Sequence, residues 1–304
     1  MGRILTMAKR FLTDPMIRFG YLNKLGVYDH MSDEAFLRYS YQIKMGESLN
    51  LENPVTFNEK LQWLKLYDRR PEYTTMADKY AMRAWVEERV GPGHTVPLLG
   101  VWDDPKQIDF DALPDQFVLK CNHNSGLGMY ICRDKAKLDK EKAIRGLKKG
   151  LKQDYYLTCR EWPYKDVKRR IIAEEYLKNG EDKDLTDYKF FCFNGEPKIM
   201  YISKENCQIP GMDYFDMEFQ HLDICMEEFP TGIIPEKPKQ FEQMKEIAAR
   251  LSEGIPQLRV DFYLMEEKIY VGELTFFHGG GMTRIKPEEW ADKFSEWLVL
   301  PERK

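Results

Sequence analysis

Two acidic side chains, Asp261 and Glu273, have the type and spacing in this sequence best suited to metal chemistry. They belong to two runs of alternating apolar and polar residues within residues 258–282, separated by Glu-Glu-Lys at 266–268. This alternation predicts two antiparallel strands around a tight turn, with both acids at the same level of the hairpin. Paired carboxylates can share divalent cations. The alternative is an ordinary hairpin whose acids are solvated on its outer face.

A glycine-rich segment follows the second run. Residues 275–281 read Thr-Phe-Phe-His-Gly-Gly-Gly, and we expect them to leave the strand and expose successive backbone N–H groups. Such a loop can cradle an anion. His278 in this segment and His123 near another glycine loop are candidate general bases, although either could serve only as a hydrogen-bonding residue.

Two lysines add positive charge to these parts. Lys120 ends a predicted apolar strand and precedes a small polar loop containing Gly126 and Gly128, whereas Lys189 lies in a predicted hairpin over residues 187–203. Lysines neutralise phosphate oxygens, carboxylates hold magnesium and a mobile loop covers the reacting phosphate, so these parts could hold a nucleoside triphosphate. No GxxxxGK[ST] motif occurs, so such a site is not a P-loop.

The elements that must position these residues change in character along the chain. The first ninety residues are predicted to be mostly helical, with a capping box at residues 56–59 opening a helix to about Tyr67 and a similar pattern at residues 75–78 opening one to about Val90. The rest is predicted as α+β. Its expected strands lie near residues 95–101, 116–120, 170–177, 187–193, 197–203, 214–219 and in the hairpin of 258–282, with helices near 134–154, 237–254 and 287–298.

Composition excludes several classes of protein. The 304 residues carry a net charge of −4, which argues against a nucleic-acid binder, and the six cysteines form no CxxC pair that would suggest zinc. We expect a cytoplasmic protein. Residues 1–28 are basic and amphipathic, so we expect them either to pack as a helix on the body or to make a peripheral contact at the inner face of the membrane.

The order of several segments resembles the ATP-grasp superfamily, and within it the TupA-like ATP-grasp family, which is associated with teichuronopeptide and capsular polysaccharide synthesis. The resemblance is carried by residues 57–65, 78–80, 117–128, 171–177, 187–195 and 258–282. It implies an α+β ATP-grasp fold, with two α+β lobes around a nucleotide cleft after a mainly helical region. The implied boundaries are 1–94 for the helical region, 95–177 for the N-lobe and 178–304 for the C-lobe with the metal-binding hairpin.

The resemblance also implies which residues bind ATP. Lys79 and Lys120 would be the two N-lobe lysines, of which Lys120 would contact the α- and β-phosphates. A flexible loop at residues 124–128 would cover the β- and γ-phosphates, and a hinge between the lobes would read adenine and ribose. These residues are Lys79, Lys120, Ser125, Gly126, Gly128, Glu174, Glu175, Tyr176 and Leu177.

The implied catalytic residues are Lys189 facing the transferred phosphate, Arg259 stabilising an acyl phosphate, and Gly280 in the loop that would help hold a tetrahedral intermediate. The implied Mg²⁺ ligands are Asp261, Glu273 and Thr275. Many relatives have Glu-x-Asn where this chain has Glu273-Leu274-Thr275, and a threonine hydroxyl is a shorter and weaker ligand than an asparagine oxygen. Water or another acid could complete the coordination of the second metal ion.

The resemblance implies an ATP-dependent carboxylate–amine ligase that forms an amide through an acyl phosphate, in capsular or cell-wall polysaccharide modification. Its substrates would be a small-molecule, lipid-linked or nucleotide-linked sugar carboxylate and an amine, with ATP and Mg²⁺ as cofactors. The alternatives are a phosphotransferase acting on a sugar hydroxyl, and a non-catalytic nucleotide-binding partner of a glycosyltransferase.

Overall fold

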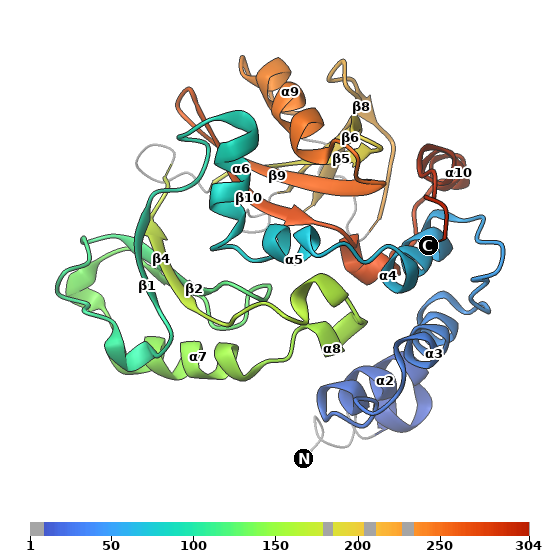
Figure 1. The fold of residues 1–304 in the computed structure, drawn as a ribbon, viewed down its shortest axis with the longest axis horizontal. Helices are drawn as coiled ribbons and strands as arrows, with labels where there is room; N and C mark the ends of the chain where they lie inside the picture. The colour runs from blue at the N-terminus through green and yellow to red at the C-terminus, as the bar shows by residue number, and fades with distance from the viewer. Residues whose placement is uncertain (1–8, 179–184, 204–210, 227–233, 304) are drawn as a thin grey trace.

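The computed structural model describes residues 9–178, 185–203, 211–226 and 234–303, and its strands form two antiparallel sheets (Figure 1). The smaller, four-stranded sheet has the order β1 (Leu98–Trp102), β4 (Ile171–Glu175), β2 (Phe117–Cys121) and β3 (Tyr130–Cys132). Helix α7 (Lys140–Lys152) packs against β2 and β3. Apolar side chains of this lobe form a core of their own, including Phe117, Leu119, Ala143, Leu147 and Ile171.

The larger, six-stranded sheet has the order β10 (Lys268–Thr275), β9 (Gln257–Met265), β5 (Asp187–Phe193), β6 (Glu196–Ser203), β7 (Met212–Phe215) and β8 (His221–Leu222). Helix α9 (Phe241–Ser252) covers one face through contacts with β5, β6 and β9. Alternate residues of β9 and β5 supply this covered face, and Phe190, Phe241 and Phe262 meet there without solvent exposure. The residues between them face the other side of the sheet, where the candidate site lies.

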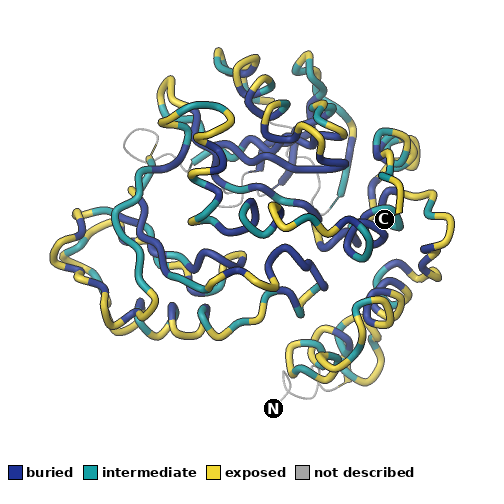
Figure 2. Tube along the Cα trace, viewed as in Figure 1, coloured by how far each residue is buried: buried dark blue, intermediate teal, exposed yellow. Residues whose placement is uncertain are grey.

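The preceding helices share the core of the large sheet. They are α2 (Pro15–Lys24), α3 (Asp33–Met45), α4 (Phe57–Tyr67), α5 (Glu72–Ala77) and α6 (Met82–Val90). Helix α4 packs against α10 (Glu288–Trp297), α5 against β10, and α6 against α9. Figure 2 shows buried backbone continuing from the large sheet into α4 and α5. The mainly helical region is therefore built into the second lobe.

The first helices also hold a segment beside the site. Helix α8 (Tyr156–Cys159) and the 3-10 turn η3 (Trp162–Tyr164) follow α7 and lie close to α3 in Figure 1. Asn23 of α2 donates to the carbonyl of Thr158 over 3.0 Å, and the buried Arg160 guanidinium donates to the carbonyl of Tyr28 over 2.8 Å. These bonds fix the segment between α8 and η3 against the body of the protein.

The predicted C-terminal hairpin is confirmed, and Glu273 pairs directly with Asp261. The register shifts by one residue between Val271 and Glu273, so Gly272 forms a β-bulge. A Cβ atom on Gly272 would lie 2.6 Å from the ring of Tyr263, so a glycine is required at the bulge.

Two other local predictions, a capping box and a tight turn, rest on the chemistry of particular residues and are confirmed. Thr56 and Glu59 make both bonds of the capping box that opens α4. Asn194 and Gly195 have φ values of 51° and 86°, as the predicted tight turn between β5 and β6 requires.

The single helix expected from about residue 75 to Val90 is wrong. Helix α5 ends at Ala77, Asp78 is extended, and α6 begins at Met82. The Asp78 carboxylate accepts hydrogen bonds from the Asn122 side chain over 2.7 Å and from the Tyr80 amide over 2.8 Å, so it caps a turn where a continuous helix was expected. This break places Lys79 at the candidate site.

Two further boundaries differ from expectation. Strand β7 ends at Phe215 because a turn over residues 216–219, held by the Asp216 side chain, follows it. The helix expected from residue 134 begins only at Lys140, where Asp139 is its N-cap.

The basic N-terminal segment is described from residue 9 onward. In α2 the ring of Phe19 is buried, whereas Leu12 and Leu25 nearby are 71% and 75% exposed. Among the described residues, no helix is long and apolar enough to cross a membrane. Peripheral membrane contact through residues 1–28 stays a prediction.

Candidate active site

Three charged side chains form the centre of the site, on the face of β5 and β9 opposite α9. Arg259 donates from Nε to Asp261 Oδ1 and from Nη2 to Asp261 Oδ2, each over 2.7 Å. Lys189 donates to Asp261 Oδ2 over 3.0 Å and to Asp187 Oδ2 over 2.9 Å. The register that pairs Lys189 with Asp261 brings these side chains together.

Each cation keeps a donor free of these carboxylates. The Arg259 guanidinium also bonds His278 Nδ1 over 2.6 Å and Thr275 Oγ1 over 3.1 Å. An arginine has five N–H donors and a lysine three, so within the described part of the chain each is left with about one donor for a ligand.

Burial and ion pairing set the protonation states of this cluster. Burial alone would raise the pKa of Asp261, but Arg259 and Lys189 hold it below its ordinary value. Burial would lower the pKa of Lys189 and Arg259, and their carboxylate partners raise both instead. Burial and the charge of Arg259 lower the pKa of His278 well below its usual value. His278 is therefore neutral and accepts a hydrogen bond from Arg259, which favours the hydrogen-bonding role over that of a general base.

Glu273 lies across the hairpin from Asp261 and has its own cation. Lys79 Nζ donates to Glu273 Oε1 over 2.7 Å and to the carbonyl of Asn124 over 2.9 Å. Burial alone would raise the pKa of Glu273, but Lys79 holds it below its ordinary value. Lys79 therefore joins the large sheet to the loop that follows β2.

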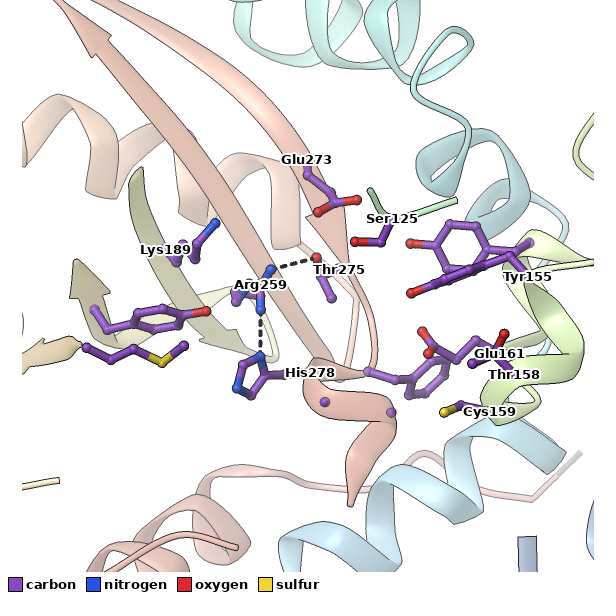
Figure 3. A pocket seen from close by; sticks show the side chains of 16 residues that line it. Ser125, Tyr155, Thr158, Cys159, Glu161, Lys189, Arg259, Glu273, Thr275 and His278 are labelled. Atoms are coloured by element: carbon purple, nitrogen blue, oxygen red, sulfur yellow. Dashed lines mark hydrogen bonds between the residues drawn. The ribbon is translucent and has the colours of Figure 1, made fainter. Parts of the chain in front are cut away.

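A cavity of about 390 Å³ opens in front of this cluster (Figure 3). It brings together residues from every predicted catalytic group: Ser125, Lys189, Arg259, Glu273, Thr275 and Gly280. Asp261 does not line the cavity and contributes through its ion pairs with Lys189 and Arg259. One wall therefore carries cations and carboxylates from the large sheet, and Ser125 reaches it from the small lobe.

Helix α4 holds the glycine-rich loop, which the structure forms as η4 (His278–Gly281). Lys65 Nζ donates to the Gly280 carbonyl over 2.6 Å, and Gln62 donates to the Gly281 carbonyl over 2.8 Å. The Gly280 amide donates to the Phe277 carbonyl over 2.9 Å. A role for the Gly280 amide in holding a tetrahedral intermediate stays a prediction, and it would require that bond to open.

The other glycine loop is far less enclosed. Ser125 and Gly126 are exposed, and a Cβ on Gly126 would meet no heavy atom within 4 Å. Gly128 differs, because a Cβ there would lie 3.0 Å from the Gly150 Cα and 3.1 Å from Cys121 Sγ. Gly128 therefore lets the end of the loop pack against α7, while Ser125 and Gly126 are free to approach a ligand.

The predicted hinge residues 174–177 and Lys120, predicted to contact phosphates, do not line this cavity. Lys120 and Glu174 form an ion pair of 2.6 Å on adjacent strands of the small sheet. The Glu175 amide donates to the Pro97 carbonyl over 3.0 Å, and the Tyr176 hydroxyl accepts from Arg133 over 3.1 Å. Leu177 follows just beyond β4 and is partly buried. The adenine-binding role of residues 174–177 stays a prediction.

Several lining residues were missed in the sequence. Tyr155, Glu161 and Tyr164 come from the segment around α8 and η3, which has no recognisable spacing. Lys65 could have been found, since Asn58, Gln62 and Lys65 lie at helical spacing on one face of α4, where all three are buried.

The candidate metal ligands fit Mg²⁺ in kind, since Asp261, Glu273 and Thr275 offer only oxygen atoms. In this structure Arg259 and Lys79 already engage the two carboxylates. Among the described residues, no group of three or more His, Cys, Asp or Glu could hold a metal ion. A magnesium ion here would depend on additional oxygens from a bound phosphate or water, which is its usual coordination in phosphate-transfer sites.

A family model described as TupA-like ATP-grasp matches residues 59–298. The comparison with curated proteins gives no match. Among solved structures, the chain is similar to D-alanine–D-alanine ligase from Helicobacter pylori, at 16% identity and a TM-score of 0.45, over 79% of this chain and 66% of that one. It is also similar to the Bacillus anthracis D-alanine–D-alanine ligase complexed with ATP, at 15% identity and a TM-score of 0.40, over 66% of this chain and 54% of that one.

A third similar structure is the ATP-grasp ligase PsnB complexed with minimal precursor, Mg and ADP, at 13% identity and a TM-score of 0.38, over 73% of this chain and 60% of that one. This chain spans between 54% and 66% of the lengths of the three structures. Likenesses this weak carry no inference about substrate or mechanism.

Proposed function

Because this chain belongs to the TupA-like ATP-grasp family, we propose that it is an ATP-dependent carboxylate–amine ligase. It uses ATP and Mg²⁺ to activate a carboxylate as an acyl phosphate, which an amine then converts to an amide. The proposed setting is capsular or cell-wall polysaccharide modification, with a free, lipid-linked or nucleotide-linked sugar carboxylate as one substrate.

One observation supports this proposal most strongly. Lys189 and Arg259 each leave about one donor toward a cavity that also receives Glu273 and Ser125. Cations fixed in place by buried carboxylates are suited to developing negative charge, because they need no reorganisation when the reaction occurs.

The proposed chemistry has two steps. An oxygen of the substrate carboxylate attacks the γ-phosphorus of ATP, the bond to the bridging oxygen breaks, and ADP leaves. Lys189 and Arg259 offset charge on the transferring group and on the acyl phosphate. An amine then attacks the acyl carbon, forming the amide and releasing phosphate. Ser125 and Gly126 cover the triphosphate, and Lys79 and Lys120 hold its oxygens.

Magnesium, when held by Asp261, Glu273 and Thr275, would neutralise phosphate oxygens. Its binding would require Lys79 and Arg259 to share or release these carboxylates. Among the described residues, the Thr275 hydroxyl makes one hydrogen bond, accepted from Arg259, so its oxygen keeps a lone pair for the metal.

The test is turnover with ATP, Mg²⁺ and a panel of uronic acids and amines. ADP and phosphate formed together with an amide support the ligase. ADP with a phosphorylated sugar would instead identify a phosphotransferase, and ATP binding without turnover would identify a non-catalytic nucleotide-binding partner.

Glu273→Gln tests the site itself. We expect at least a roughly 100-fold loss of turnover with an unchanged fold by circular dichroism, because the carboxylate that faces Asp261 is lost. Glu288→Gln, at the exposed start of α10, is the matched control. Near-normal activity of Glu273→Gln would show that the proposed metal ligands are wrong.

A further inference from the structure

Glu161 is a buried acid on the wall of the cavity that faces the charge cluster. It lies between α8 and η3, has 6% exposure and lines the cavity. Figure 3 shows it beside Thr158 and Cys159, across the cavity from Arg259. Hydrogen bonds from the first helices fix this segment, so the side chain has a defined position.

Within the described part of the chain, the Glu161 carboxylate oxygens accept no hydrogen bond and form no ion pair. Its nearest cationic neighbour on α4, Lys65, directs its three donors to Gln62 Oε1, the Cys159 carbonyl and the Gly280 carbonyl, at 3.1, 2.9 and 2.6 Å. A buried carboxylate without a donor is costly unless a ligand supplies one.

The charged groups around Glu161 leave it able to exchange a proton near neutral pH. Burial and, to a smaller extent, Glu273 of β10 raise the pKa of Glu161, whereas Lys65 of α4, Lys44 of α3 and Arg259 of β9 lower it, and together they bring it to about 7. A group that is partly ionised at the working pH can accept a proton during a reaction and release it afterwards.

The two walls of the cavity therefore prefer opposite charges. Lys189 and Arg259 suit the triphosphate and the substrate carboxylate, whereas Glu161 suits a cation or a hydrogen-bond donor. Thr158 and Cys159 of the same wall also line a second, larger hollow of about 720 Å³ beside α2.

We propose that Glu161 binds the amine of the second substrate and accepts its proton as the amine attacks the acyl phosphate. This inference rests on the proposed ligase function and deepens it, because it identifies the second substrate as a primary amine that binds as an ammonium. The ammonium first gives one proton to the Glu161 carboxylate, and the nitrogen lone pair this exposes forms the C–N bond. The bond from the acyl carbon to the phosphate oxygen breaks, and the second proton lost by the nitrogen leaves on the phosphate.

Hydroxylamine separates the two steps of the reaction. It is largely unprotonated at neutral pH and traps an acyl phosphate as a hydroxamate without a general base. In Glu161→Gln we expect hydroxamate formation from ATP and the uronic acid panel within about threefold of the wild type, and amide formation reduced at least about 100-fold. Glu161→Asp should recover part of the amide formation.

Equal losses of hydroxamate and amide, or unchanged amide formation, would overturn the role of Glu161. If the wild-type protein forms no hydroxamate, the proposed ligase function fails, and direct binding then decides whether Glu161 is an amine site. Saturation-transfer NMR with glycine, alanine, lysine and glutamate should show binding of at least one amine that Glu161→Gln weakens at least about tenfold.

Binding that is equal in the two proteins, or absent from both, would overturn the site. Glu141→Gln, on the exposed face of α7, is the matched control and should behave as the wild type in both assays. Thermal unfolding confirms that each variant is folded.

Discussion

The two glycine loops that reach the cavity are alike in sequence and opposite in structure. Residues 124–128 are attached to the small lobe, and Ser125 and Gly126 are exposed. The loop of η4 is enclosed by α4, whose Lys65 and Gln62 hold its carbonyls. Glycine content alone does not distinguish these cases. The hydrogen-bond partners of the backbone do distinguish them. They indicate that residues 124–128 form a covering loop on one side of the cavity and that the η4 loop forms a fixed wall on the other.

The largest expected effect comes from removing the Lys65 ammonium, which holds the η4 loop against α4. Lys65→Met leaves the carbonyls of Cys159 and Gly280 and the oxygen of Gln62 without a donor, so we expect a loss of roughly 4 kcal/mol in the free energy of unfolding. Urea unfolding measures it. Lys149→Met, on exposed α7, should change stability by less than about 0.5 kcal/mol. A loss equally small in Lys65→Met would mean that the loop does not depend on α4.

Alanine substitutions at one glycine in each loop compare the two directly. Gly281 has φ +70°, and its Cβ would lie 2.5 Å from Gln62 Nε2 and 3.0 Å from Leu61 Cβ, so Gly281→Ala should lose roughly 3 kcal/mol through strain and overpacking. Gly126 has φ +76° but open surroundings, so Gly126→Ala should lose about 1 kcal/mol. Equal losses of unfolding free energy in the two variants, measured by thermal or urea unfolding, would contradict the distinction between the fixed η4 loop and the covering loop of residues 124–128.

A pH dependence that arises from Glu161 is expected to be smaller than the effects of Lys65→Met and Gly281→Ala. The folded-state pKa of Glu161 is about 7, against an ordinary value of 4.5, so the folded protein binds more protons between these values. The contribution of Glu161 to stability is therefore fully present below pH 4.5 and is lost as the pH rises through 7. From pH 5 to pH 8, Glu161→Gln should gain about 2 kcal/mol of unfolding free energy relative to the wild type.

Burial lowers the pKa of Lys65 to about 8 from 10.5, so its effect has the opposite direction. The unfolded chain binds more protons between pH 8 and 10.5, and stability contributed by Lys65 rises over that range. Urea unfolding at pH 5 and 8 isolates the effect of Glu161. If Glu141→Gln shows the same change in unfolding free energy between pH 5 and pH 8, the effect arises from the loss of a negative charge in general and not from the environment of Glu161.

Predictions from sequence succeeded where chemistry is local. The capping box at Thr56 and Glu59, the turn at Asn194 and Gly195, and the level of Asp261 with Glu273 all follow from neighbouring residues, and all three are confirmed. The break at Asp78 could not be predicted in this way, because the partner that stabilises it, Asn122, lies 44 residues further along the chain.

The segment of residues 155–164, which carries Glu161, has even fewer features in the sequence that would mark it as part of the site. Glu161 acquires its environment from Lys65, Glu273 and helices at the start of the chain, so nothing in residues 155–164 distinguishes it from a surface acid. Family resemblance pointed to the charged wall but to neither Glu161 nor Lys65. Opposing charges across a cavity become visible only when both lobes are in place.

The bulge at Gly272 shifts by one residue the alternation that decides which side chains of β10 face the core. Before it, Ile269 and Val271 face the core; after it, Leu274 faces the core while Glu273 and Thr275 face the cavity. Counting every second residue from Ile269 would have put Glu273 in the apolar interior. Gly272, which has no side chain, thus changes which side chains of the strand face the cavity. An insertion or deletion between Val271 and Leu274 that the bulge cannot absorb would place a leucine in the cavity instead of an acid.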